Sequence, residues 1–131
     1  MPVDLTVYLS DRPGQLAAVA RHLADADVNI DGYFGLVVGG RGIMHVLVDD
    51  AAGESAARLL RDAGFEVGQP EEVLVLDCED RPGTLAERVE PIAAAGVNVT
   101  VSYLAAATRV VVGAEDLDRA REAVEGAPLT S

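Results

Sequence analysis

The sequence contains one pattern twice. Asp11-Arg12-Pro13-Gly14 returns 69 residues later as Asp80-Arg81-Pro82-Gly83, and Asn29-Ile30 returns at the same spacing as Asn98-Val99. A repeat that runs without a gap over such a span indicates one structural unit that is used twice. The sequence therefore predicts two similar domains, residues 1–70 and residues 71–131.

The composition limits the class of protein and its partners. Half of the 131 residues are apolar, which is enough for a hydrophobic core in one ordinary domain or two small ones. Twenty-two acidic residues against ten basic ones give a net charge of −12. A surface this acidic repels nucleic-acid phosphates and anionic membranes, so neither is expected as a partner. No apolar run approaches the roughly 20 residues that cross a bilayer, so membrane spans are not expected.

The single cysteine, Cys78, cannot form a disulfide within the chain. No charged and then apolar leader follows Met1, so we expect a cytoplasmic protein. Cys78 stands in the second copy where Leu9 stands in the first. We therefore expect it to pack as a small hydrophobic side chain and to be unreactive.

Periodicity predicts the same elements in both copies. The first copy has alternating or helical apolar spacing in the order strand, helix, strand, strand, helix, strand, at residues 3–9, 13–26, 28–38, 43–48, 54–63 and 65–67. Asp11 is expected to cap the first helix. Leu16, Ala20 and Leu23 follow one another at helical spacing in that helix. Charged side chains at 49–50 and 71–72 are expected in solvated turns.

The second copy is shorter and differs at its end. Its elements are expected at residues 73–78 and 82–95, then in a hairpin that starts at 97–99 and turns at 105–107, and in a last helix at 116–125, with Leu85, Val89 and Ile92 facing inward from the first helix. The strand at 73–78 is apolar on both faces and is therefore expected at the centre of a sheet. Only residues 127–131 remain, interrupted by Pro128, so a full last strand is not expected.

Together these features resemble the ACT domain, twice. The resemblance is carried by Asp11-Arg12-Pro13-Gly14-Gln15-Leu16 with Val28-Asn29-Ile30, and by Asp80-Arg81-Pro82-Gly83-Thr84-Leu85 with Val97-Asn98-Val99. It implies an α+β chain of two tandem ferredoxin-like βαββαβ units, each an antiparallel sheet with its helices on one face. It also implies a regulatory protein that binds an amino acid near the Pro-Gly loops where units pair, with a homodimer and a regulated partner protein as further expectations.

The residues themselves are suited to a zwitterionic ligand. Backbone N–H groups at a helix start attract a carboxylate, and glycine there allows a close approach or a positive φ. Asp11 or Asp80 could face an ammonium group, while the Asn29 and Asn98 amides supply donors and acceptors. The candidate ligand-binding residues are Asp11, Arg12, Pro13, Gly14, Gln15, Leu16, Asn29, Ile30, Asp80, Pro82, Gly83, Thr84, Leu85, Asn98 and Val99.

Other interpretations stay open. The Asp-Arg-Pro-Gly segments are also good helix starts, and the asparagines could satisfy local backbone groups. Gln15 against Thr84 makes the two loops unequal, so one site can be silent, and the first is then the better candidate. No nucleophile, nucleotide or metal-binding pattern is present, so no enzyme activity, cofactor or metal is expected. The competing hypothesis is a non-catalytic dimerisation or protein-interaction module without a ligand.

Overall fold

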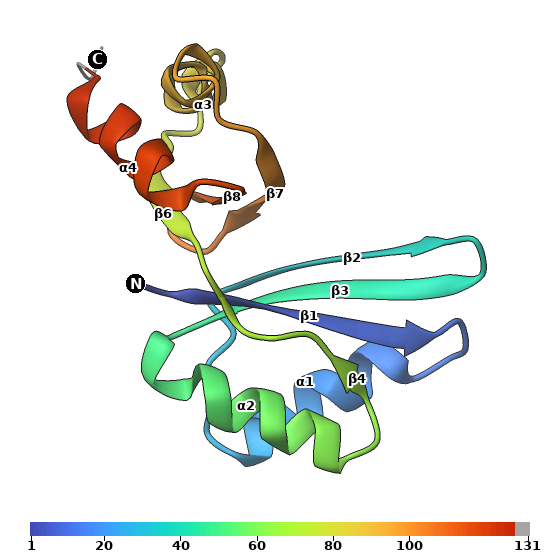
Figure 1. Ribbon diagram of the computed structural model, residues 1–131. Helices are drawn as coiled ribbons and strands as arrows, with labels where there is room; N and C mark the ends of the chain where they lie inside the picture. The colour runs from blue at the N-terminus through green and yellow to red at the C-terminus, as the bar shows by residue number, and fades with distance from the viewer. Residues whose placement is uncertain (128–131) are drawn as a thin grey trace. The chain divides into compact units, whose positions relative to one another are not determined.

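The computed structural model of the protein describes residues 1–127 (Figure 1). The chain divides into two compact units, unit 1 (Met1–Glu72) and unit 2 (Val73–Ser131). Each unit contains helices and an antiparallel arrangement of strands, which confirms the predicted α+β class. Along residues 1–127, every helix is too short or too polar to span a bilayer.

Unit 1 contains the predicted βαββαβ succession and one further short strand. Its elements are β1 (Val3–Ser10), α1 (Gln15–Asp25), β2 (Gly32–Val38), β3 (Arg41–Val48), α2 (Asp50–Asp62), β4 (Glu66–Val67) and β5 (Glu71–Glu72). The sequence predicts a turn at Glu71–Glu72, and this is wrong because both residues pair with β1 as β5. Their side chains are nevertheless exposed, as expected of solvated charges.

The sheet of unit 1 has the strand order β4-β1-β3-β2, and neighbouring strands are antiparallel. In its register Val7 of β1 lies opposite Met44 of β3, which in turn lies opposite Gly35 of β2. Helices α1 and α2 lie side by side on one face of this sheet (Figure 1). The buried core lies between these helices and the sheet, and consists of Val3, Leu5, Val7, Val19, Leu23, Met44, Val46, Val48, Ala56, Ala57, Leu60 and Val67.

Helix α2 begins four residues earlier than the sequence predicts, and Gly53 is the reason. Glycine lowers helix propensity, so the prediction places the start after it. In the structure Gly53 is buried, and a Cβ there would lie 2.7 Å from Cγ2 of Val3. The missing side chain therefore lets α2 pack closely on β1, and this packing outweighs the lower propensity.

Unit 2 has fewer strands among the described residues. Its elements are β6 (Leu74–Asp77), α3 (Thr84–Ala94), β7 (Val99–Ala105), β8 (Arg109–Ala114) and α4 (Leu117–Gly126). Helices α3 and α4 lie side by side, and α4 packs on β8. Cys78 is buried and free, as expected of a small hydrophobic side chain. The expected lack of a full last strand concerns residues 128–131, which lie outside the described residues.

Among the described residues 1–127, the prediction that the strand at 73–78 is central is wrong. Strands in unit 2 follow the order β7-β8-β6, which puts β6 at the end of this series. Val73 and Leu74 are both buried, so the two faces are covered there as the apolar pattern indicates. Burial of both faces of a strand does not show whether the strand is paired along one edge or along both. The apolar pattern therefore could not predict the position of β6 in the sheet.

Both repeated loops enter their helices through glycine. Gly14 precedes α1 with φ 89°, and Gly83 precedes α3 with φ 90°. No side chain caps either helix, so the prediction that Asp11 is the cap is wrong. Asp11 lies three residues before Gly14, which leaves its carboxylate too early in the chain to act as the N-cap acceptor. The loop shape is set by the left-handed glycine instead.

The second hairpin is strained at its tip. Ala107 and Thr108 have φ values of 60° and 51°, a region that a β-branched residue rarely adopts. We expect Thr108→Gly to raise the free energy of unfolding by about 1 kcal/mol, because glycine removes this strain. Urea unfolding measures the change. Val38→Gly, at an exposed position in the regular register of β2, is the control and should lower stability, so a loss of stability in Thr108→Gly as well would contradict the assignment of strain.

Candidate functional site

A pocket of about 400 Å³ lies beside the first Asp-Arg-Pro-Gly loop, and we call it the unit 1 pocket. It is formed by the end of β1, the start of α1, the middle of β2 and the start of β3. Its lining residues are Leu9, Ser10, Asp11, Arg12, Gln15, Leu16, Tyr33, Gly35, Leu36, Val37, Gly42, Ile43 and Met44. The volume falls in the range of about 300–1,000 Å³ that is usual for small-molecule sites.

Arg12 provides the positive charge of the unit 1 pocket. Its side chain is exposed, and within residues 1–127 it makes no hydrogen bond or ion pair. The guanidinium has five N–H donors in a planar fork, which matches the two oxygens of a carboxylate. Arg12 is therefore available to an anion that enters the pocket.

The start of α1 adds further donors on the same side. The backbone N–H groups of Gln15, Leu16 and Ala17 have no backbone acceptor within the described part of the chain. Such groups carry the positive end of the helix dipole and favour an anion. The helix start and Arg12 thus act in the same electrostatic direction.

Two more polar side chains line this pocket. Oε1 of Gln15 accepts a hydrogen bond from the backbone N–H of Ser10 at 3.2 Å, which holds the Gln15 side chain across the loop. Its amide nitrogen stays a donor beside the pocket. Asp11 contributes a carboxylate, which could accept hydrogen bonds from an ammonium group.

An apolar groove continues from this pocket along α1. A second cavity of about 270 Å³ shares Leu16, Tyr33 and Met44 with the unit 1 pocket and also contacts Ile30. Leu16 is 48% exposed and Tyr33 is 55% exposed, so both apolar side chains are open to solvent. Leu16 has the same helical spacing as the buried residues of α1, but it lies one turn before them. The spacing alone therefore does not predict that Leu16 is exposed.

The structure does not bring all the candidate residues of unit 1 to the pocket. Pro13 and Gly14 shape the loop but do not line the cavity. Asn29 donates from Nδ2 to Oδ1 of Asp31 at 2.6 Å, is exposed, and does not line the pocket. Asp11, Arg12, Gln15 and Leu16 line the pocket, and Ile30 lines the adjoining groove.

Unit 2 has a corresponding cavity of about 430 Å³ beside its own loop, the unit 2 pocket. Its lining residues are Cys78, Glu79, Asp80, Arg81, Leu85, Leu104, Ala105, Thr108 and Arg109. Leu85 is 49% exposed and matches Leu16 in the repeat, so the expectation that it faces inward is wrong. The repeated leucines therefore lie beside pockets in both units and not in the cores.

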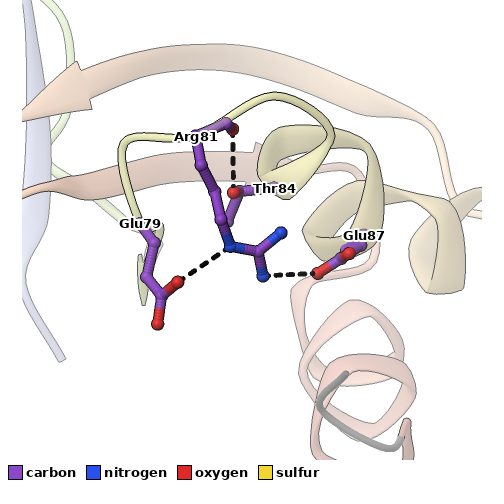
Figure 2. A network of polar contacts seen from close by, with 4 residues as sticks. All are labelled: Glu79, Arg81, Thr84 and Glu87. Carbon is purple, nitrogen blue, oxygen red and sulfur yellow. Dashed lines mark hydrogen bonds and ion pairs between the residues drawn. The ribbon is translucent and has the colours of Figure 1, made fainter. Parts of the chain in front are cut away.

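Arg81 is tied to two carboxylates. Figure 2 shows its Nε donating to Oε2 of Glu79 at 2.9 Å, while one terminal nitrogen lies 3.5 Å from Oε2 of Glu87. The hydrogen bond to Glu79, followed by the charge of Glu87, holds the pKa of Arg81 above its ordinary value. The hydroxyl of Thr84 donates to the backbone carbonyl of Arg81 at 3.0 Å and so ties the loop to the first residue of α3.

The other candidate residues of unit 2 have structural partners or lie elsewhere. Thr84 is buried, and Pro82 and Gly83 shape the loop without lining the cavity. Asn98 donates from Nδ2 to Oε1 of Glu115 at 3.2 Å. Val99 begins β7 and is absent from the pocket lining. Only Asp80 and Leu85 of the predicted set lie at the unit 2 pocket.

No protein-family model matches the sequence, and no curated protein matches it either. Among solved structures, protein BT0572 from Bacteroides thetaiotaomicron is 25% identical, with a TM-score of 0.80 over 94% of this chain and 85% of that one. The regulatory subunit of aspartate kinase from Thermus flavus is 20% identical, with a TM-score of 0.72 over 96% and 92%. The ligand-free regulatory subunit from Thermus thermophilus is 18% identical, with a TM-score of 0.75 over 95% and 89%.

The chain has the tandem ACT fold. Its two ACT units share the loop shape and the position of the pocket, but not the side chains around the loop arginine. Sequence reasoning did not single out Glu79 or Glu87, which decide this difference. The signal was available, since the repeat of the tandem ACT chain aligns Glu79 with Ser10 and Glu87 with Ala18.

Proposed function

We propose that this tandem ACT chain is a non-catalytic regulatory protein that binds an amino acid in the unit 1 pocket. The observation that carries the proposal is the unengaged guanidinium of Arg12 at a cavity that also presents Asp11, free helix N–H groups and apolar walls. An α-amino acid needs a partner for its carboxylate, a partner for its ammonium group and a surface for its side chain. The unit 1 pocket offers all three.

The individual roles follow from this chemistry. Arg12 and the N–H groups at the start of α1 bind the ligand carboxylate, and Asp11 accepts hydrogen bonds from the ammonium group. The amide of Gln15 orients the carboxylate. Leu16 and Tyr33 contact the ligand side chain, and their apolar groove favours a hydrophobic amino acid over a small polar one.

The regulatory part of the proposal is supported by the fold. Proteins with this fold include the regulatory subunits of aspartate kinase from two Thermus species. We propose that ligand binding in this chain likewise changes the activity of a separate partner protein, and that the chain itself carries out no reaction. The pocket is suited to recognition, since its lining contains no serine or cysteine beside a histidine that could activate it.

The test is a thermal-shift and calorimetric titration of the protein against the twenty L-amino acids. A ligand at a hundred times its Kd adds about 2.7 kcal/mol to the free energy of unfolding. Arg12→Ala should weaken that ligand at least roughly tenfold, because a charged hydrogen bond contributes about 1.5–3 kcal/mol. Arg58→Ala removes an exposed arginine of α2 that has no partner in residues 1–127, and it should leave the affinity unchanged.

Two results would count against the proposal. One is the absence of any stabilising amino acid in the wild-type protein. The other is a ligand whose affinity falls equally in Arg12→Ala and Arg58→Ala, because this would show an effect of net charge and not of the pocket.

A second candidate function is supported by the surface of β2. Phe34, Leu36 and Val38 alternate onto one face of β2 and are between 42% and 56% exposed, and such large apolar side chains on one strand face are typical of interaction surfaces. We propose that this strand contacts a second copy of the chain in a homodimer. Analytical ultracentrifugation of wild type and Val38→Glu tests it, with a dimer expected only in the wild type. A wild-type monomer at micromolar concentrations would rule out this function.

A further inference from the structure

We propose that unit 2 keeps its own pocket closed to anionic ligands with an internal clamp, in which Glu79 and Glu87 occupy Arg81. The inference rests on the proposed function for the choice of ligand class, an acidic group on a small molecule. It goes further in assigning the two pockets of one chain different roles. The anion-binding site is in unit 1, and its counterpart in unit 2 is silent.

The geometry of the clamp is that of a satisfied site. Nε of Arg81 lies 2.9 Å from Oε2 of Glu79, and NH2 lies 3.5 Å from Oε2 of Glu87 (Figure 2). The two glutamates approach the guanidinium from different elements, since Glu79 precedes the loop and Glu87 is on the first turn of α3. A ligand carboxylate that bound bidentately through Nε and NH2 would have to displace them.

The repeat shows that the clamp belongs to unit 2 alone. Glu79 corresponds to Ser10 and Glu87 corresponds to Ala18, neither of which can form an ion pair. The arginine and the glycine entry are the same in both units, with φ 89° at Gly14 and 90° at Gly83. Among residues 1–127, Arg12 therefore has no side-chain partner, whereas Arg81, on a backbone of the same shape, is held by the carboxylates of Glu79 and Glu87.

Competition and charge act in the same direction. Carboxylates attached to the same chain compete with a free ligand as if present at millimolar concentration or above. At the pocket Glu79 and Asp80 are balanced by Arg81 and Arg109, and Glu87 of the clamp leaves a net charge of −1. A second carboxylate group brought in by a ligand meets repulsion there, whereas Asp11 and Arg12 of unit 1 balance one another.

Chemical modification tests the clamp without knowledge of the ligand. The probe is phenylglyoxal, with the reaction at each arginine followed by peptide mass spectrometry. Arg12 should react about fivefold faster than Arg81 in the wild type, as expected of a free against an ion-paired guanidinium. In Glu79→Ser/Glu87→Ala, Arg81 should react as fast as Arg12. Glu54→Ser/Glu90→Ala, which removes two exposed glutamates outside the clamp, should leave the contrast unchanged.

Inorganic sulfate then tests closure to anions. Sulfate should slow the modification of Arg12 in the wild type and should slow that of Arg81 only in Glu79→Ser/Glu87→Ala. The clamp is overturned if Arg81 in the wild type reacts as fast as Arg12, if sulfate protects it there, or if the double substitution changes neither property. Glu79→Ser/Glu87→Ala introduces the residues that unit 1 has at the same places, and Glu54→Ser/Glu90→Ala changes two exposed side chains. Both variants should therefore fold.

The amino-acid panel separates this inference from the proposed function. If an amino acid protects Arg12 alone in the wild type and both arginines in Glu79→Ser/Glu87→Ala, both ideas are supported. If no amino acid protects Arg12, the proposed function fails. The relative reactivity of Arg81 and its response to sulfate still decide the clamp in that case.

Discussion

Replacement of Ile92 by alanine is expected to lower the free energy of unfolding by about 2–5 kcal/mol, because it leaves a cavity in the core of unit 2. Ile92 is fully buried on α3, and it corresponds in the repeat to Leu23, which is fully buried on α1. Urea unfolding followed by circular dichroism measures the loss. Leu23→Ala should produce a loss of the same size in unit 1.

The control for this prediction is Leu104→Ala in β7. Leu104 is 69% exposed, so its truncation should change stability by less than about 0.5 kcal/mol. Equal losses in Ile92→Ala and Leu104→Ala would contradict the burial of Ile92 that the structure shows.

Replacement of Asp4 by alanine is the second large expected effect, a loss of about 1–3 kcal/mol. Asp4 is 3% exposed, and its Oδ2 accepts a hydrogen bond from Nδ1 of His45 at 2.8 Å. Oγ1 of Thr6 lies 3.4 Å from the same nitrogen. Alanine removes the carboxylate that accepts the hydrogen bond of the largely buried His45 imidazole. The resulting loss of stability should exceed that caused by breaking an exposed ion pair.

Asp25→Ala is the matched control, again read out by urea unfolding. Asp25 lies 3.7 Å from Arg21 in an i,i+4 pair whose side chains are both well exposed, so its loss should cost less than about 0.5 kcal/mol. Asp4→Asn keeps an acceptor oxygen and should fall between the two. If Asp4→Ala proved as mild as Asp25→Ala, the burial of the Asp4–His45 pair would not contribute to stability.

The repeat and the hydrophobic periodicity predicted the fold because both depend on the order and type of the secondary-structure elements. Two copies in register indicate the order of elements, and alternating residues such as Leu5 and Val7 place one strand face in the core. What they could not supply was the environment of single positions. Gly53 marks a break by propensity but a close packing contact in space, and Leu85 continues a helical stripe yet lies at a pocket.

The candidate site was predictable as a location but not as a set of partners. The loops of both units do lie at pockets, and Asp11, Arg12 and Gln15 line the first of them. Whether an arginine is free or engaged depends on side chains two and six residues away from it, which approach it only when the loop turns into the helix. Glu79 and Glu87 meet Arg81 in this way, and no local sequence pattern gives their distances.

The loop before α1 has a kinetic consequence for the proposed binding function. Ser10 ties the ends of this loop, since its N–H donates to Oε1 of Gln15 and its carbonyl accepts from the N–H of Arg12, so binding of the proposed ligand would order little further backbone and would carry little cost in conformational entropy. Association with a preorganised site of this kind is governed by diffusion, and differences among related molecules then appear in their residence times. If amino acids bind as proposed, stopped-flow measurements on a series of them should show similar on-rates and widely different off-rates.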